Sequence, residues 1–179
     1  MKTQSLEHLL GKIEEAVCSI GKEEQETLID SILKAKTVFI YGSGRSGLVG
    51  QLFAVRLVQM GLDVHFVGDM TTPIIGKDDL TILISNTGET MSAVQTANIA
   101  RRIGSEVICV TGNSSSKLAH ASNLVIEVKN DGQADSQYAP LGTIFEDAVS
   151  IFFDSIVPCI MKKKGIDEND MRKRHAIWV

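Results

Sequence analysis

Short apolar runs recur along the middle of the chain, separated by stretches in which apolar residues return every three or four positions. The runs lie at residues 37–41, 62–67, 80–84, 105–110 and 123–128. The stretches with helical spacing lie at about 46–60, 90–103 and 115–121. Strands that are apolar throughout are expected when helices cover both faces of a parallel sheet. The pattern therefore predicts a three-layer α/β/α fold around a five-stranded parallel sheet, for which we expect the flavodoxin-like order 2-1-3-4-5.

Further helices are predicted on both sides of this alternating region. Residues 1–36 repeat leucine and isoleucine at helical spacing, a long helix is expected at about 142–164, and a short helix from about 167 carries Arg174 and His175. Pro158 should kink or break the long helix. The residues of that helix expected to face the core are Ile144, Ala148, Ile151, Phe152, Ser155, Ile156 and Cys159. With no internal repeat, residues 1–179 are predicted to form one domain, with helices 1–36 and 142–176 packed on the sheet.

Composition narrows the classes of protein to consider. The chain has 44% hydrophobic and 22% charged residues, as in an average globular domain. No apolar run is long enough for a membrane span, and no signal peptide is recognisable, so we expect a cytoplasmic protein without a membrane partner. The net charge of −4 argues against a nucleic-acid partner. Cys18, Cys109 and Cys159 stand among apolar neighbours and are predicted to be core thiols.

The first glycine-rich loop, YGSGRSG at 41–47, follows a predicted strand and opens a predicted helix. Its glycines fit the Gly-x-Gly-x-x-Gly pattern of dinucleotide sites, which also requires an acid after the next strand. Asp69 could supply that acid, so the loop by itself leaves an NAD-binding protein as an alternative.

A second loop, SNTGET at 85–90, favours a phosphate ligand instead. Three hydroxyl side chains surround Gly88 immediately before a predicted helix. Amide groups at a helix N-terminus attract anions, and hydroxyls add neutral donors. The alternative is that Ser85 and Thr90 only cap the helix, which explains one or two hydroxyls but not three and a glycine. If the strand order is as expected, both loops border the same crevice at the carboxyl edge of the sheet.

Taken together, these residues resemble the sugar-isomerase (SIS) domain family. Gly42, Gly44 and Ser46 match its first loop, and the segment 85–90 matches its phosphate loop, with Thr87 where serine is frequent. The segments GDMTTP (68–73), PLGTIFED (140–147) and KRH (173–175) extend the resemblance over nearly the whole chain. Within the family, the chain is most similar to members that interconvert 3-hexulose 6-phosphate and fructose 6-phosphate. The resemblance implies this reaction, in formaldehyde fixation through ribulose monophosphate or in pentose supply.

Moving a ketone from carbon 3 to carbon 2 requires one base that removes and returns a proton through a cis-enediolate, with donors for the enediolate oxygen. Neither a metal nor another cofactor is required. The resemblance makes Glu146 the candidate base and His175 the candidate acid, in its own or a neighbouring subunit's site, whereas Asp147 is expected to point away. The residues predicted to bind substrate are Gly42, Ser43, Gly44, Arg45, Ser46, Ser85, Asn86, Thr87, Gly88, Glu89 and Thr90.

Two further alternatives stay open from the sequence. A non-catalytic sugar-phosphate sensor would keep the phosphate loop without the base, and another isomerase of the family would act on a different phosphosugar. His8, His65 and His120 are expected to be structural or surface residues. The apolar stripes of the leading helices exceed what the sheet requires, so we expect a homodimer or homotetramer.

Overall fold

The computed structural model describes residues 3–130 and 137–175, and its five parallel strands follow the predicted order β2-β1-β3-β4-β5. The strand bounds are β1 Val38–Gly42, β2 Val64–Phe66, β3 Leu80–Ser85, β4 Glu106–Thr111 and β5 Leu124–Glu127. The central strand β3 is buried along its whole length, as the continuous apolar runs predicted. The chain crosses over between β2 and β3, which places the ends of β1 and β3 side by side.

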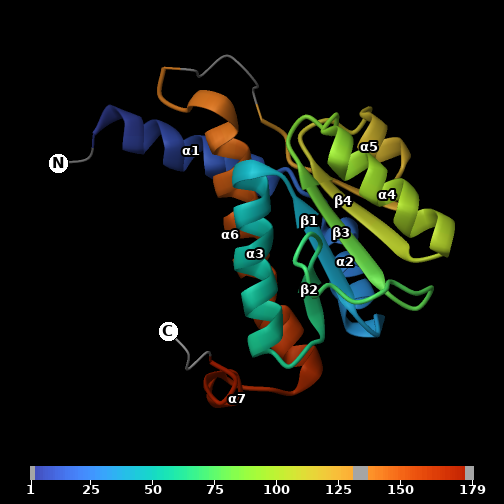
Figure 1. The fold of residues 1–179 in the computed structure, drawn as a ribbon. Helices are drawn as coiled ribbons and strands as arrows, with labels where there is room; N and C mark the ends of the chain where they lie inside the picture. Colours follow the sequence, from blue (N-terminus) through green and yellow to red (C-terminus); the bar gives the residue numbers. More distant parts are fainter. Residues whose placement is uncertain (1–2, 131–136, 176–179) are drawn as a thin grey trace.

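Helices cover both faces of the sheet (Figure 1). Helices α4 and α5 lie on one face, with α2, α3 and α6 on the other and α1 packed against α6. The helix bounds are α1 Gln4–Cys18, α2 Lys22–Lys34, α3 Gly44–Gln59, α4 Met91–Ile103, α5 Lys117–His120, α6 Thr143–Lys164 and α7 Glu168–Arg172, with a 3₁₀ turn, η2, at Pro140–Gly142. The predicted three-layer α/β/α fold is therefore confirmed.

The larger hydrophobic core lies between the sheet and the long helix α6. It combines buried side chains from α1, α2, α3 and α6 with those of the strands. A smaller core under α4 and α5 fills the other face. The stacked rings of Phe53 on α3 and Phe153 on α6, with centroids 4.0 Å apart, join the two helices that flank the first loop.

The predicted inner face of α6 is partly wrong. Ile151, Ser155 and Cys159 are exposed, whereas Phe153 and Val157 are buried. The phenylalanine stack with α3 sets the rotation of α6, and this rotation turns the line through residues 151, 155 and 159 outward. A prediction of the buried face from the spacing of apolar residues within α6 could not take the contact with Phe53 of α3 into account.

Two smaller predictions are also corrected. Helix α6 continues through Pro158 without a break. Proline has no amide N–H, so one backbone carbonyl of the preceding turn is left unpaired. Because Pro158 lies on the exposed side of the helix, water can solvate that carbonyl. Of the three predicted core thiols, Cys109 is buried, but Cys18 and Cys159 are exposed.

Within residues 3–130 and 137–175, no helix is both long enough and apolar enough to cross a bilayer. The short helix α7 ends at Arg172, so Arg174 and His175 follow it in a turn rather than lying on it. Of the segment 142–176 predicted to pack on the sheet, residue 176 lies outside the described residues.

Candidate active site

The first loop joins β1 to α3 through a very close backbone contact. A Cβ atom on Gly47 would lie 2.4 Å from the carbonyl oxygen of Gly42, and a Cβ on Gly42 would lie 2.8 Å from the amide nitrogen of Gly47. Both glycines therefore serve the packing of the helix onto the strand. Between them, Ser43 and Arg45 are exposed at the start of α3, whereas Ser46 is buried. The glycine pattern that resembled a dinucleotide site thus has a structural explanation.

The second loop, 85–90, is held in shape by its own hydroxyls. The Ser85 hydroxyl lies 3.0 Å from the Thr90 hydroxyl and accepts a hydrogen bond from the amide of Gly88 at 3.2 Å. The Thr87 hydroxyl accepts from the amide of Glu89 at 3.2 Å. Thr90 occupies the N-cap position of α4, but its side chain makes no capping hydrogen bond. The capping alternative therefore fails for Thr90, and no side chain in the described part of the chain caps the N-terminus of α4.

Gly88 is required by conformation and by space. Its φ of +64° lies in the left-handed region that favours glycine. A Cβ at this position would come within 2.0 Å of the Ser116 hydroxyl oxygen and 3.0 Å of the Thr111 hydroxyl oxygen. The absence of a Cβ at Gly88 therefore makes room for the buried side chain of Ser116 from the neighbouring loop.

Glu146 lies in the first turn of α6 and is buried, with 6% of its surface exposed. Its carboxylate accepts two hydrogen bonds from the first loop, one from the Ser46 hydroxyl to Oε1 at 3.1 Å and one from Arg45 Nε to Oε2 at 3.2 Å. A charge this buried is stable only when it is paired and hydrogen-bonded. The α3 and α6 N-termini therefore meet around one fixed carboxylate.

Asn86 connects this carboxylate to the second loop. A Cβ built on Gly142, at the N-cap of α6, would lie 2.9 Å from Asn86 Nδ2 and 3.4 Å from Glu146 Oε2. The amide of the 85–90 loop and the carboxylate of α6 thus border one small space. Gly142 and Glu146, at the start of α6, therefore join the two predicted loops in the candidate site.

Two acidic residues near the site differ from expectation. The carboxylate of Glu89 accepts from the backbone amide of Lys117 at 3.1 Å and from its ammonium at 2.8 Å, so it faces α5. Hydrogen bonding from the Lys117 side chain lowers the pKa of Glu89. Asp147 was expected to point away from the site, but its Oδ1 lies 3.7 Å from the Arg45 guanidinium. Arg45 therefore contacts two successive acids of α6.

His175 lies far from Glu146 within the same chain. The adjacent Arg174 packs against Gly61, just beyond the C-terminal end of α3, whereas Arg45 stands at its N-terminal end. At 1.5 Å per residue, the helix between them is more than about 20 Å long. His175 is exposed and helps to line a groove between α3 and β2 with the side chains of Val55, Val58, Phe66 and Asp69. The structure does not bring the two candidate catalytic residues together in one subunit.

The other three histidines are occupied in local contacts. His65 lies 3.2 Å from Asp63 and stacks on Phe39, and His120 Nδ1 lies 2.8 Å from the Ser116 carbonyl oxygen. His8 packs against Tyr138. In the described part of the chain, no group of three or more His, Cys, Asp or Glu side chains is arranged to hold a metal ion.

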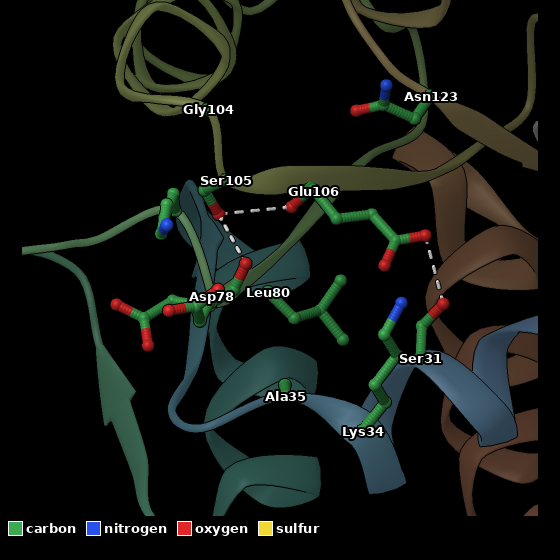
Figure 2. Close-up of a pocket in the computed structure, with 11 residues that line it drawn as sticks. Ser31, Lys34, Ala35, Asp78, Leu80, Gly104, Ser105, Glu106 and Asn123 are labelled. Carbon is green, nitrogen blue, oxygen red and sulfur yellow. Dashed lines mark hydrogen bonds between the residues drawn. The ribbon is translucent and has the colours of Figure 1, made fainter.

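A polar pocket of about 360 Å³ lies at the opposite, amino edge of the sheet (Figure 2). Its polar side chains largely bond to the protein. Ser31 donates to Glu106 at 3.0 Å, and the Ser105 hydroxyl donates to the carbonyl of Asp79 at 2.8 Å. The first of these bonds fastens α2 to β4. None of the loop residues or Glu146 lines this pocket, so the carboxyl edge remains the candidate site.

Known proteins are similar to this chain in sequence and in fold. The family model of the SIS domain matches residues 31–145. A protein of Methanocaldococcus jannaschii named 3-hexulose-6-phosphate isomerase is 41% identical over 156 residues, which cover 87% of this chain and 84% of that protein. A Bacillus subtilis protein of the same name is 34% identical over 179 residues, covering 97% of both chains.

A solved structure is similar over the same range. It is a hypothetical protein from Methanococcus jannaschii, for which a molecular function of 3-hexulose-6-phosphate isomerase was inferred. It superposes with a TM-score of 0.86 at 35% sequence identity, covering 95% of this chain and 98% of that chain. The match therefore extends over nearly the whole of both chains.

Proposed function

This chain belongs to the SIS domain family, and we propose that it is an enzyme that interconverts 3-hexulose 6-phosphate and fructose 6-phosphate. The observation that carries this proposal is the buried carboxylate of Glu146 beside the Asn86 amide of the phosphate loop. A sugar phosphate bound at the loop would extend its carbon chain toward that carboxylate. The relatives' names support this choice of substrate over other phosphosugars.

In the proposed mechanism, the phosphate binds at the α4 N-terminus and the 85–90 loop. Amides and hydroxyls there supply donors without a further charge. Glu146 removes the proton from carbon 2 of the 3-hexulose and returns it to carbon 3, through a cis-enediolate. Ser46 and Arg45 hold the carboxylate in position during both transfers. The substrate gains and loses no electrons, so the reaction requires no redox cofactor.

A second group must move a proton between the oxygens of carbons 2 and 3, and we assign this role to His175 of a neighbouring copy. Because this histidine lies more than about 20 Å along α3 from Arg45 of its own chain, only a composite site could use it. An exposed apolar stripe on α3, consisting of Leu48, Leu52, Val55 and Val58, offers a surface for such a copy. We therefore propose a homodimer or homotetramer.

The composite site can be tested by mixing two variants, Glu146→Gln and His175→Ala. In a dimer that exchanges subunits freely, each mixed dimer contains one intact site, so about a quarter of the wild-type rate should return. No recovery on mixing would mean that the two residues do not share a site across subunits.

The role of Glu146 is tested by the Glu146→Gln variant alone, which keeps the shape of the side chain. We expect kcat for fructose 6-phosphate to fall about 10²–10⁴-fold, while the variant still binds the substrate in a calorimetric titration. The control is Asp154→Asn. It removes an exposed carboxylate of the same helix, α6, and should leave kcat unchanged. Unchanged turnover in Glu146→Gln would remove this residue from the mechanism.

The same experiment separates the enzyme from a sensor. A non-catalytic sugar-phosphate sensor would bind fructose 6-phosphate but would show no exchange of its carbon-bound hydrogen with solvent, in wild type or variant. The appearance of a 3-hexulose phosphate would identify the product.

Since a phosphorylated sugar is a dianion that does not cross bilayers, we propose that the enzyme acts in the cytoplasm, in formaldehyde fixation through ribulose monophosphate or in pentose supply.

A further inference from the structure

Asn130, just after β5, makes contacts that determine which way its amide group faces. Its Nδ2 lies 3.2 Å from the backbone carbonyl oxygen of Val128 and 3.2 Å from Oδ1 of Asn86. A carbonyl oxygen can only accept, so the atom facing Val128 must be the NH₂ nitrogen. The same nitrogen then donates to Asn86.

This donation fixes the orientation of the Asn86 amide. With Oδ1 of Asn86 turned toward Asn130, its Nδ2 must face the other way, toward Gly142 and the carboxylate of Glu146. Among the described residues, Nδ2 of Asn86 has no hydrogen-bond acceptor, so its two N–H groups face the space beside the proposed base. The backbone of Asn86 is also held, since its carbonyl accepts from the amide of Gly112 at 2.9 Å.

Gly112 makes the contact between the two amides possible. A Cβ at this position would lie 2.5 Å from Asn86 Oδ1 and 2.6 Å from Asn130 Nδ2. Any other residue would separate the pair. Residues 86, 112 and 130, which follow β3, β4 and β5, thus come together and fix the side-chain amide of Asn86.

We propose that Asn130 is a positioning residue. It fixes the amide of Asn86 so that the NH₂ group donates to the oxygen that becomes negative in the enediolate formed at Glu146. Preorganised donors at a developing oxyanion are among the largest contributions to catalysis. This proposal rests on the proposed function and adds the group that stabilises the charge, together with the residue that aims it.

The test is a double-mutant cycle on kcat with fructose 6-phosphate as substrate. Removing the donor in Asn86→Ala should lower kcat about 10²–10³-fold. Asn130→Ala should lower kcat about tenfold with KM changed less than about twofold, since the amide can then rotate. In the Asn86→Ala background, Asn130→Ala should have less than about a twofold effect. Asn98→Ala, on the exposed face of α4, is the matched control and should leave kcat unchanged.

A merely structural role gives additive losses, so an equal loss of kcat from Asn130→Ala in the wild-type and Asn86→Ala backgrounds would overturn the proposal. An effect of Asn130→Ala on KM alone would overturn it as well. Should Asn130→Ala not fold, the nearly isosteric Asn130→Asp replaces it in the same cycle, and the same two results support or overturn the proposal. A wild-type protein without turnover of fructose 6-phosphate would reject the proposed function. Turnover in the wild type with additive losses would reject the role of Asn130 alone.

Discussion

Replacing Gly88 by alanine is the sharpest structural test of the phosphate loop. The left-handed φ of +64° costs a residue with a Cβ about 1–2 kcal/mol. The new Cβ would also meet Ser116, at 2.0 Å from its hydroxyl oxygen and 2.4 Å from its Cβ. Because the Cβ of Ser116 is fixed by the backbone, no rotation of this side chain removes the overlap.

Ser116 cannot move without a further loss, since its hydroxyl caps α5 by accepting from the amide of Ala119 at 3.3 Å. A lost cap costs about 1 kcal/mol. The contributions together predict that Gly88→Ala lowers the free energy of unfolding by about 2–3 kcal/mol. The displaced loop should also bind fructose 6-phosphate more weakly.

Urea unfolding and calorimetric titration of the same samples measure both effects. In a Ser116→Gly background the two closest contacts are gone, so the cost of Gly88→Ala should drop to about 1–2 kcal/mol, mainly from the backbone. Gly11→Ala is the matched control, because nothing lies within 4 Å of its added Cβ, and on α1 it should stabilise by about 0.5–1 kcal/mol. A cost for Gly88→Ala that is below about 0.5 kcal/mol, or equal in both backgrounds, would refute the reasoning.

Three other predictions follow from single contacts. Ser46→Ala removes a donor from the buried carboxylate of Glu146, and steady-state kinetics should show kcat reduced about tenfold or more at similar KM. Burial raises the pKa of Cys109 to about 11, so a thiol reagent at pH 8 should modify the two exposed cysteines and spare this one until the protein unfolds. Hydrogen bonding to Lys117 lowers the pKa of Glu89 from 4.5, so the ionised carboxylate stabilises the folded protein above pH 4.5 and this contribution is lost as the pH falls below that value. In urea unfolding, the free energy of unfolding of Glu89→Gln should therefore decrease less on acidification than that of the wild type.

The fold could be predicted because its signals are local. Each buried strand is a continuous apolar run, and glycine or hydroxyl residues end or follow the first four strands, so the strands were located within a few residues. The order expected of a flavodoxin-like sheet is the order observed. The face of α6 could not be predicted in the same way. Its rotation depends on the ring of Phe53, which lies 100 residues away in the sequence and packs on Phe153. The exposure of Cys159 is a consequence of that long-range contact.

Candidate site residues could be chosen from the sequence where one short segment carries a recognisable motif. The loops and Glu146 stand in short motifs, and the structure brings Ser46, Asn86 and Glu146 around one space. Asn130 had no such motif, because its role appears only when β4 and β5 bring it beside Asn86. Asp147 was misjudged because a helical wheel considers only α6, whereas Arg45 reaches it from α3.

The choice of α4 for the phosphate follows from a comparison with α5, since both helices begin at the carboxyl edge of the sheet. At α5, protein groups already occupy the first amides: Ser116 accepts from Ala119, and Glu89 accepts from Lys117. At α4, the N-cap hydroxyl of Thr90 is turned toward Ser85 instead of toward the helix. A carboxylate at α5 would repel a phosphate, whereas α4 presents a positive helix end to which no side chain of the described residues supplies a cap. An incoming dianion is therefore directed to the helix whose N-terminus adjoins Asn86, on the side of the proposed base.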